Sequence, residues 1–514
     1  MNFLEILDGA EVLSQSGDDC PVKGLDYDSR RVQPAWVFVA MRGESTDGNR
    51  YIDAAIAAGA SAVVTDSGTE TPREGVAWAV VLHGRRALAR LSANFYKRPA
   101  ERLRVTGITG TNGKTTATFI VESILQAAGR KNALVGTIEC HLAGETLPAP
   151  HTTPEALELN RMLARSLARG ATKAVMEVSS HALHQGRVYG IPFDVAVFTN
   201  LTQDHLDYHK TMEQYSAAKR ILFEGCGTEP PRCAVVNLDD EYGRRLAEFS
   251  RRRSQLFTYG IEQGDFHAEH LEMTPHENRF VLTTPHGPIE LRSPLIGRVN
   301  VYNVLAACAA AYARGCSAEP IARGIAAISR IPGRFERVDE AQPFAVVVDF
   351  AHTDDALKNL TRLAREFVSR NVSPQDVFSH GVAANGKGRV ITVFGCGGDR
   401  DRGKRPKMGR AAGEGSDFVL VTSDNPRSED PMAIIEETLA GLRETGTRFA
   451  VEPDRRKAIA LALAEARAGD IVLLAGKGHE RTQIMRDAEV PFDDHQVASE
   501  ELNRMGYKRE GAHA

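Results

Sequence analysis

The sequence predicts an α/β protein of three domains, and three observations support this fold class. The chain has 514 residues, whereas a single domain usually holds about 100–200. Short apolar, β-branched runs typical of buried parallel strands alternate with helical patterns in two separate stretches. A glycine-rich segment, residues 107–116, lies between a strand pattern and a helix pattern in the first stretch. We therefore expect domains over residues 1–100, 101–335 and 336–514.

The first 100 residues predict a small α/β domain. The runs VFVAM (37–41) and SAVVTD (61–66) read as short strands, with an alanine-rich helix between them. Shorter strands and a single clear helix indicate a smaller sheet than in the rest of the chain.

The second domain predicts a parallel sheet of the phosphate-loop type with helices on both faces. Strand patterns cover residues 102–110, 132–138, 174–180, 195–201 and 233–239. Helical patterns cover 114–129 and 154–170, the latter with Pro154 in its first turn. Residues 261–294 contain glycine, histidine and proline and predict hairpins.

The third domain repeats the alternation and predicts a Rossmann-like α/β fold. Strand patterns cover residues 344–351, 389–395, 418–424 and 471–476, and helical patterns cover 356–370, 432–444 and 455–469. Residues 371–388 have loop composition and predict a surface insertion.

Composition excludes several classes of function. Aromatic residues make up 6% of the chain and the formal charge is -4, which disfavours a nucleic-acid partner. The seven cysteines are scattered and never spaced C-x-x-C, which argues against a disulfide framework and a zinc site. No apolar run reaches the roughly 18–20 residues of a membrane helix, and the first residues do not resemble a signal peptide. We expect a cytoplasmic protein without a membrane partner.

The glycine-rich segment has the composition of a nucleotide-binding loop. Its glycines and the following helix N-terminus would turn backbone N–H groups toward a phosphate chain. Lys114 would contact β- and γ-phosphates, and Thr115 would ligate Mg²⁺. The strict phosphate-loop pattern fails because Ile108 replaces its first glycine. A turn without a ligand is the structural alternative, and a kinase, motor ATPase, GTP switch or ligase would each suit such a loop. The residues expected to bind nucleotide are Gly110, Thr111, Asn112, Gly113, Lys114, Thr115 and Thr116.

Further segments along the whole chain resemble the Mur ligases, ATP-dependent enzymes that build the peptidoglycan stem peptide. The segments are GITGTNGKTT (107–116), EVSSH (177–181), TNLTQDHLDYH (199–209), AK (218–219), GRVN (297–300), PGR (332–334), DFAHT (349–353), GGDRDRGKRP (397–406), DNPR (424–427) and GKGHE (476–480). Together they resemble the branch that adds the third residue to UDP-MurNAc-L-Ala-D-Glu. Folylpolyglutamate synthases and cyanophycin synthetases are more distant relatives.

The resemblance implies ATP and Mg²⁺ as cofactors and formation of an acyl phosphate. Thr115, Glu177, His205 and Lys219 resemble the metal-site residues of the family, and Lys114, Lys219 and His205 the catalytic ones. The family lysine matching Lys219 is carbamylated, which needs a depressed pKa. Without the resemblance, Lys219 would be read as a solvated surface lysine and His205 as a capping or packing histidine.

Asn300, Arg334 and Asp349 resemble the positions that hold adenine, phosphate and ribose. Asn300 also suits the N-cap of the helix that follows it. One departure occurs here: the family has Tyr-Ala-His-Thr-Pro-Asp, whereas this chain has Phe350 and Asp354 in place of the tyrosine and proline.

The remaining matched residues resemble substrate contacts. Ser29, Glu44, Ser45 and Thr46 match the uridine diphosphate site, which makes residues 1–100 the UDP-sugar-binding domain. The muramoyl-dipeptide contacts match Thr152, Thr153, Ser179, Gln185 and Arg187. Taken one at a time, each is more typical of a turn or cap.

The C-terminal domain is implied to bind the incoming amino acid. The residues are Arg400, Asp424, Asn425, Pro426, Arg427, Gly476 and Glu480. In the family, DNPR marks the enzymes that use meso-diaminopimelate, because arginine can bind its distal carboxylate bidentately, a group that lysine lacks. The structural alternative is a turn followed by a helix cap.

Three alternatives stay open: the same reaction with L-lysine, a folylpolyglutamate synthase-like ligase, and a nucleotide-dependent switch without ligation. The ligase interpretation also predicts a monomer whose last domain closes on the central one by rotation near Pro343.

Overall fold

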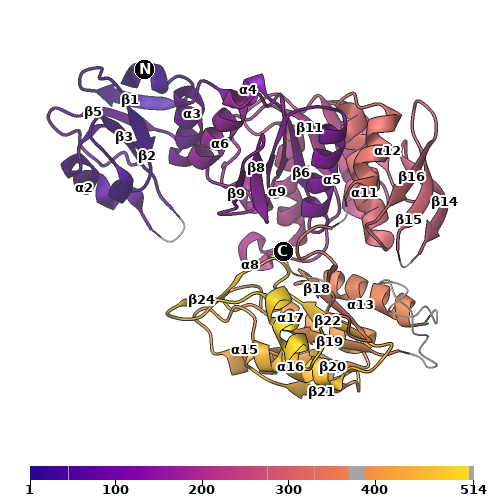
Figure 1. Ribbon diagram of the computed structural model, residues 1–514. Helices are drawn as coiled ribbons and strands as arrows, with labels where there is room; N and C mark the ends of the chain where they lie inside the picture. Colours follow the sequence, from indigo (N-terminus) through magenta and orange to yellow (C-terminus); the bar gives the residue numbers. More distant parts are fainter. Residues whose placement is uncertain (44–45, 275, 329, 370–387, 509–514) are drawn as a thin grey trace.

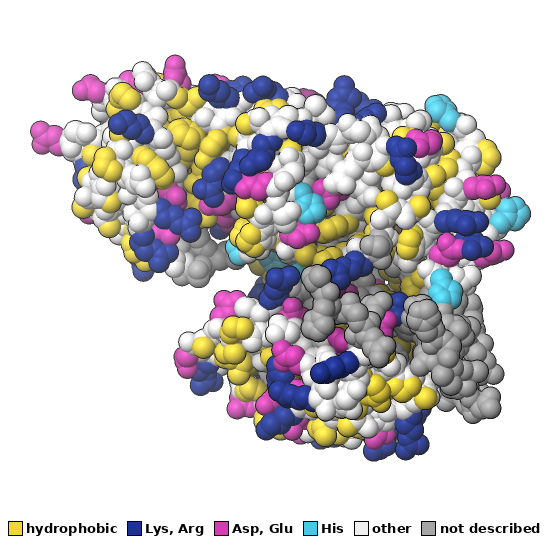
Figure 2. Space-filling model, in the orientation of Figure 1, with side chains coloured by type: hydrophobic (Ala, Val, Ile, Leu, Met, Phe, Trp, Pro, Cys, Tyr) yellow, Lys and Arg dark blue, Asp and Glu magenta, His cyan; other side chains and the backbone are white. Residues whose placement is uncertain are grey.

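Figure 1 shows the computed structural model of the chain, which places a small N-terminal body beside a large central one and a third body below the centre. The structure describes residues 1–43, 46–274, 276–328, 330–369 and 388–508. Within these residues the strands form sheets of five, eight, three, six and two strands. In Figure 2, basic and acidic side chains are interspersed over the visible face, as the small net charge leads one to expect.

The N-terminal sheet has the strand order β1-β5-β4-β3-β2. Its strands are parallel except β1, which pairs antiparallel with β5. Alternation along β3 and β4 sends side chains to two cores, one on each face of the sheet. The bounds are β1 Val12–Ser16, β2 Gly24–Asp26, β3 Trp36–Ala40, β4 Ala60–Thr65, β5 Ala77–Val81, α1 Phe3–Ile6, α2 Ile52–Ala57, α3 Gly84–Phe95 and α4 Pro99–Arg102.

The central sheet has the order β13-β12-β11-β6-β10-β7-β8-β9. The first six strands in this order are parallel, and β8 and β9 add an antiparallel extension. Strand β6 lies between β11 and β10, so the glycine-rich loop that follows it leaves the middle of the sheet edge. The bounds are β6 Arg104–Thr109, β7 Asn132–Val135, β8 Glu139–Leu142, β9 Thr146–Pro148, β10 Lys173–Glu177, β11 Phe193–Phe198, β12 Cys233–Asn237 and β13 Gln255–Tyr259.

Helices cover both faces of this sheet. One core includes side chains of α5 (Lys114–Ala127), α11 (Arg298–Ala313) and α12 (Ala318–Ala326). The other includes α6 (Ala156–Ala168), α9 (Met212–Glu224) and α10 (Glu241–Ser250). The short helices α7 (Ser180–His184) and α8 (Leu206–His209) follow β10 and β11. The predicted phosphate-loop-type sheet with helices on both faces is confirmed.

The predicted hairpins form a three-stranded antiparallel sheet, β14 (His267–Met273), β15 (Asn278–Thr283) and β16 (Ile289–Ser293). Its apolar face, including Phe280 and Leu282, joins the core beneath α11 and α12.

The C-terminal sheet has the order β17-β18-β22-β19-β20-β21 and is parallel except for β17. Helices α13, α14 and α15 pack on one face, and α16 and α17 on the other. The strands are β17 Glu336–Val338, β18 Ala345–Asp349, β19 Val390–Phe394, β20 Phe418–Val421, β21 Arg448–Val451 and β22 Ile471–Ala475, with the small hairpin β23 Thr482–Ile484 and β24 Glu489–Pro491. The helices are α13 Asp354–Ser369, α14 Lys404–Gly415, α15 Pro431–Arg443, α16 Arg455–Glu465 and α17 Asp494–Arg504.

Several local predictions differ from the structure. Helix α6 begins at Ala156, so Pro154 lies before it and outside its first turn. Helix α11 begins at Arg298 after Gly297, which puts Asn300 inside the first turn, not at the cap. Helix α14 was not predicted, because its glycines and Pro406 hide it. The helix tolerates Pro406 because this residue lies in the first turn, where the backbone N–H that proline lacks would have no partner within the helix. The predicted insertion over 371–388 lies, apart from Gly388, outside the described residues.

No helix in the described part of the chain combines the length and apolar character needed to cross a bilayer.

Candidate active site

A cavity of about 460 Å³ lies between the central and C-terminal sheets. Its upper wall comes from the loop after β6, the end of β10, the segment after β11 and the start of α11. Its lower wall comes from residues that follow β18, β19, β20 and β22. Parallel strands of both sheets therefore direct their carboxyl ends at one space, which is where open α/β sheets hold ligands.

The glycine-rich loop requires its glycines. Gly110 and Gly113 have φ of 148° and 86°. A Cβ atom at Gly110 would lie 1.8 Å from Thr199 Oγ1, and one at Gly113 would lie 2.3 Å from Asn303 Oδ1. Both the backbone conformation and the space around it exclude a side chain. Ile108, which breaks the strict motif, is the next-to-last residue of β6 and lies fully buried in the core.

The segment that follows the neighbouring strand β11 holds the loop in place. Thr111 N donates to Asn200 O at 2.8 Å, and Asn112 N donates to Asn200 Oδ1 at 3.0 Å. The Thr199 hydroxyl donates to Asn112 O at 2.6 Å. Lys114 folds back, and its Nζ donates to Gly110 O at 3.0 Å and to Thr111 O at 2.9 Å. The start of α5 is thus a rigid cradle whose helix N-terminus faces the cavity.

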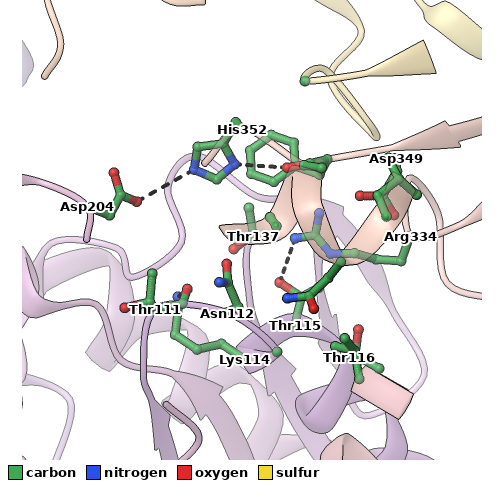
Figure 3. Close-up of a pocket in the computed structure, with 18 of the residues that line it drawn as sticks. Thr111, Asn112, Lys114, Thr115, Thr116, Thr137, Asp204, Arg334, Asp349 and His352 are labelled. Carbon is green, nitrogen blue, oxygen red and sulfur yellow. Dashed lines mark hydrogen bonds and ion pairs between the residues drawn. The ribbon is translucent and has the colours of Figure 1, made fainter. Parts of the chain in front are cut away.

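Oxygen donors gather beside this cradle (Figure 3). Thr115 Oγ1 donates to Glu177 Oε2 at 2.9 Å, and Glu177 Oε1 accepts from Thr137 N at 2.7 Å. Arg334 Nη2 donates to Thr115 Oγ1 at 3.2 Å from the opposite side. A hydroxyl and a carboxylate are hard oxygen ligands of the kind that suits Mg²⁺. Within the described residues, no group of three or more histidine, cysteine, aspartate or glutamate side chains is arranged to hold a metal.

Lys219 lies under the loop and not at the surface. Its side chain is 2% exposed, and its Nζ donates to Gly110 O at 2.8 Å. The ring of Tyr215, one turn earlier on α9, lies 4.4 Å from the same nitrogen. Burial and the nearby Lys114 hold the pKa of Lys219 well below its ordinary value. The interpretation of this residue as a solvated lysine is wrong, and burial is the reason.

Two acidic side chains link the central region to the C-terminal one. Buried Asp204 lies 3.7 Å from His352 Nε2 and 3.6 Å from Lys404 Nζ (Figure 3 shows the first pair). Asn112 Nδ2 donates to Asp355 Oδ2 at 2.9 Å.

His205, which follows Asp204 in the chain, is half-buried at the cavity, and burial lowers its pKa to about 3, although Asp204 opposes the shift. Its imidazole is therefore neutral and able to donate a lone pair.

Arg334, Asp349 and Asn300 line the far side of the cavity. Asp349 Oδ2 accepts from Phe335 N at 2.7 Å. Burial raises the pKa of Asp349, with Arg334 acting against the rise. The guanidinium of Arg334 lies 4.7 Å from the ring of Phe350. Phe350, one of the two departures from the family pattern, is thus a flat support for that arginine.

The residues matched to the muramoyl dipeptide all lie in the central region, but only two of them line the cavity. Thr152 and Ser179 line the cavity, and Thr152 Oγ1 lies 3.1 Å from Thr137 Oγ1. Arg187 donates to Thr153 O at 3.1 Å and pairs with Glu155 at 3.0 Å. Gln185 is the C-cap of α7 and lies with Thr153 and Arg187 outside the cavity lining.

Ser29 and Thr46, two of the four residues matched to uridine diphosphate, lie outside the lining of this cavity. Ser29 is half-buried at the start of a short 3₁₀ helix, and Thr46 is exposed. Glu44 and Ser45 lie outside the described residues. Arg85 of α3 reaches the central region, where it donates to Glu155 Oε1 at 3.0 Å.

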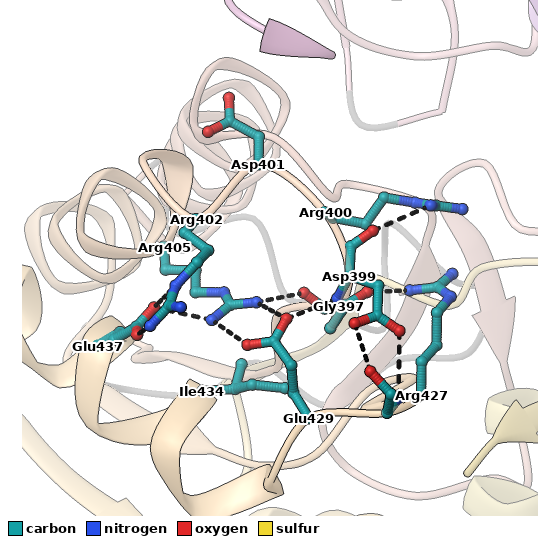
Figure 4. Close-up of polar contacts among 12 residues, drawn as sticks. Gly397, Asp399, Arg400, Asp401, Arg402, Arg405, Arg427, Glu429, Ile434 and Glu437 are labelled. Atoms are coloured by element: carbon teal, nitrogen blue, oxygen red, sulfur yellow. Dashed lines mark hydrogen bonds and ion pairs between the residues drawn. The ribbon is translucent and has the colours of Figure 1, made fainter. Parts of the chain in front are cut away.

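The C-terminal wall carries a charged group of residues (Figure 4). Arg400 and Arg427 lie next to each other, and Arg427 Nη1 donates to Gly398 O at 2.7 Å. Burial and the nearby Arg400 lower the pKa of Arg427. Asp424, Asn425, Gly476 and Glu480 line the same end of the cavity, whereas Pro426 is buried behind it. Two cationic forks beside two carboxylates form a suitable site for a ligand that carries both charges.

A supporting network lies behind these arginines. Arg405 is fully buried, and its guanidinium bonds Glu429 at 2.7 Å and Glu437 at 2.7 Å (Figure 4). Glu429 in turn accepts from Asp399 N at 2.6 Å, which fixes the segment that carries Arg400. Sequence reasoning assigned no role to Arg405, Asp204, Thr137 or Lys404. Lys404 and Arg405 lie inside the quoted segment 397–406 and Asp204 inside 199–209, which was the available signal, whereas Thr137 lies outside every quoted segment.

Comparisons with known proteins agree with this geometry. The models for the Mur ligase family catalytic domain, the Mur ligase middle domain and the Mur ligase glutamate ligase domain match residues 21–96, 108–311 and 378–478. The UDP-N-acetylmuramoyl-L-alanyl-D-glutamate–2,6-diaminopimelate ligase of Solibacter usitatus is 50% identical over 511 residues, 99% of each chain.

Two solved structures extend the likeness. A structure of a ligase with that same name is 32% identical, covers 95% of this chain and 96% of its own, and has a TM-score of 0.64. The MurF ligase of Thermotoga maritima in complex with ADP has a TM-score of 0.62 at 18% identity, covers 94% of this chain and 97% of its own, and shares the fold.

Proposed function

The chain belongs to the Mur ligase family, and from this premise we propose that it is the ATP-dependent ligase that joins meso-diaminopimelate to the D-glutamate of UDP-MurNAc-L-Ala-D-Glu. One observation carries the proposal. A single cavity is lined at one end by the glycine-rich loop with Lys114 and at the other by Arg400, Arg427 and Glu480. Such a cavity can bring an activated carboxylate and an incoming amine together.

The reaction that suits this cavity has two steps. A substrate carboxylate oxygen attacks the γ-phosphorus of ATP, forming an acyl phosphate and releasing ADP. The amine of diaminopimelate then attacks the acyl carbon, an amide forms, the amine loses a proton, and inorganic phosphate leaves. Neither step needs a covalent bond to the protein, so positioning and neutralisation of phosphate charge supply the catalysis.

We assign the nucleotide phosphates to the loop Gly110–Thr116. Its backbone N–H groups and the start of α5 would hold them, and Lys114 would leave its two carbonyl partners to meet their charge. Arg334, which already reaches Thr115, would neutralise the γ-phosphate with a planar fork. Asn300 and Asp349 are assigned to adenine and ribose.

Magnesium fits the oxygen donors near the loop. Thr115 and Glu177 would hold one ion, and His205 and a carbamylated Lys219 would help hold a second. Because Mg²⁺ keeps waters and binds substrate phosphates, a site with few protein ligands suits it. When bound, the ion would neutralise phosphate charge during transfer. Carbamylation of Lys219 is supported by its burial and lowered pKa, since only the neutral amine reacts with carbon dioxide.

The two substrates would occupy opposite sides. Thr152, Thr153, Ser179, Gln185 and Arg187 would contact the muramoyl dipeptide. Ser29, Glu44, Ser45 and Thr46 would contact the uridine diphosphate, with residues 1–100 as its domain. Residues 101–335 would bind ATP and residues 336–514 the amino acid.

At the acceptor end, Arg427 and Arg400 would bind carboxylates of diaminopimelate. Glu480 and Asp424 would bind its distal ammonium, with Asn425, Pro426 and Gly476 shaping the site. We further propose that the enzyme is a monomer located in the cytoplasm.

The test measures phosphate release by the purified protein with MgATP and UDP-MurNAc-L-Ala-D-Glu. One reaction contains meso-diaminopimelate and the other L-lysine. Release with diaminopimelate alone supports the proposal. Preference for lysine keeps the mechanism but overturns the assigned specificity, and no acceptor-dependent release with either overturns the function.

A further inference from the structure

Lys477 follows Gly476 directly after β22, and its side chain is fully buried. Sequence reasoning assigned roles to Gly476 and Glu480 and none to the lysine between them. An ammonium group is costly to bury and persists in a protein interior only when partners hold it. The partners of Lys477 therefore indicate what it does.

Both partners of this ammonium are acceptor-site residues. Lys477 Nζ donates to Glu480 Oε2 at 2.9 Å and to Asn425 Oδ1 at 3.1 Å. Asn425 Nδ2 donates to the same Glu480 oxygen at 2.8 Å, and Asn425 Oδ1 also accepts from Ile484 N at 2.9 Å. The three side chains form a closed ring that joins the segments after β20 and β22.

The ring fixes the orientation of the Glu480 carboxylate. Its Oε2 accepts two hydrogen bonds, whereas no donor among the described residues contacts Oε1. Glu480 is partly exposed and lines the cavity, so Oε1 is the oxygen available to a ligand. The Lys477 ammonium lies on the Oε2 side of the carboxylate and balances its negative charge.

We propose that Lys477 is a positioning residue that also sets acceptor specificity: it orients Glu480 and weakens the attraction of that carboxylate for a lone ammonium group. This inference rests on the proposed function. L-lysine brings a distal ammonium alone, and its main partner would be a Glu480 that is already neutralised. Diaminopimelate brings a distal ammonium and a distal carboxylate together. Its binding therefore depends less on Glu480, because Arg427 binds the carboxylate. Specificity of this kind is a difference between two affinities, and weakening the competitor raises it.

The experiment compares Lys477→Met with the unmodified enzyme. Methionine keeps most of the volume and removes the charge and both hydrogen bonds. The matched control is Lys457→Met on α16, because Lys457 is 70% exposed and lies outside the cavity lining. Steady-state kinetics give kcat and KM for diaminopimelate, for L-lysine, for ATP and for the UDP-linked substrate.

We expect the ratio of kcat/KM for diaminopimelate over L-lysine to fall by about tenfold or more in Lys477→Met, with the KM of ATP and of the UDP-linked substrate changed by less than about twofold. The control keeps the ratio. An unchanged ratio, or equal losses for all substrates, overturns the inference, because a merely structural lysine would act on every substrate alike.

A second variant, Lys477→Gln, guards against a failure to fold. Glutamine can donate to both acceptors without a charge, and the same fall in the ratio is expected. A wild-type ratio in Lys477→Gln overturns the role of the charge. If the unmodified enzyme shows no acceptor-dependent phosphate release, the proposed function fails before Lys477 is tested, so the two failures are distinguishable.

Discussion

The two ends of the cavity are built in different ways. At the end that we assign to the nucleotide, one continuous segment makes the loop, and backbone groups and glycines define its shape. At the end that we assign to the acceptor, the segments after β19, β20 and β22 meet, and charged and polar side chains hold them in place. A backbone-built site should depend on few side chains, each with a large effect. A site built from paired charges should spread its effects over many residues and express them as specificity.

The largest effect is expected at Lys114. Lys114→Met removes one of the side-chain cations at the loop end of the cavity, beside Arg334, and we expect kcat to fall by about 10³-fold or more. The loop itself should persist, because Asn200 and Thr199 hold it. Phosphate release and the thermal midpoint are both measured, with the exposed Lys131→Met as control. Near-normal turnover in Lys114→Met would show that the loop backbone and Arg334 suffice without this lysine.

A smaller effect is expected at the other end. Arg427→Lys keeps the charge and removes the planar fork, so we expect kcat/KM for diaminopimelate to fall by about 10- to 100-fold. The KM of ATP should stay the same. Titration of each substrate separates the two constants. Equal loss toward ATP and diaminopimelate would mean that the two ends are not separable.

The smallest effect on activity is expected at Asp204, which links the central and C-terminal regions. Asp204→Asn removes the charge that faces His352 and Lys404, and we expect kcat to fall by about tenfold, within the range of perturbing one charged partner. Small-angle scattering with and without substrates reports whether closure changes. An identical response in the variant and the unmodified protein would argue against a role for Asp204 in joining the regions.

The smallest effect concerns stability away from either end. Burial would lower the pKa of His141, but Glu122 and Glu139 raise it to about 9. Because the folded pKa exceeds the unfolded value near 6.5, the protonated ring stabilises the fold below about pH 6.5 and this contribution is lost as pH rises through 9. We expect it to amount to about 1–3 kcal/mol.

Thermal unfolding between pH 6 and pH 10 tests this expectation, with His141→Gln as the variant. The difference in midpoint between the two proteins should be largest at pH 6 and shrink toward pH 10. A constant difference would mean that the histidine acts by packing alone.

The contrast between the two ends also explains what the sequence could predict. The alternating strand and helix patterns identified the main parallel strands, because buried strands need continuous apolar runs. The loop was visible because glycines, lysine and threonine occur in a fixed order between a strand and a helix. Arg400, Arg427 and Glu480 were visible only through the family resemblance, because residues that lie 27 to 80 positions apart in the chain form no local pattern.

Other features needed the structure. Nothing in the pattern around Lys219 distinguishes a buried lysine from a surface one, and only the packing of Tyr215 and the loop reveals it. Lys477 was overlooked for the same reason, because its partners come from side chains that the fold brings together. Helix α14 was hidden by glycines that its close approach to α15 requires: a Cβ at Gly409 would lie 2.1 Å from Thr438 O.

The shared cavity has a pharmacological consequence. Because one space is lined by both the glycine-rich loop and the charged acceptor residues, a single molecule can occupy both ends. Two weak fragments, a phosphate mimic and a diamino diacid, gain avidity when a linker of matched length joins them, by roughly 10²- to 10⁴-fold over either fragment. We therefore expect the continuous cavity to be one extended target for a bisubstrate inhibitor.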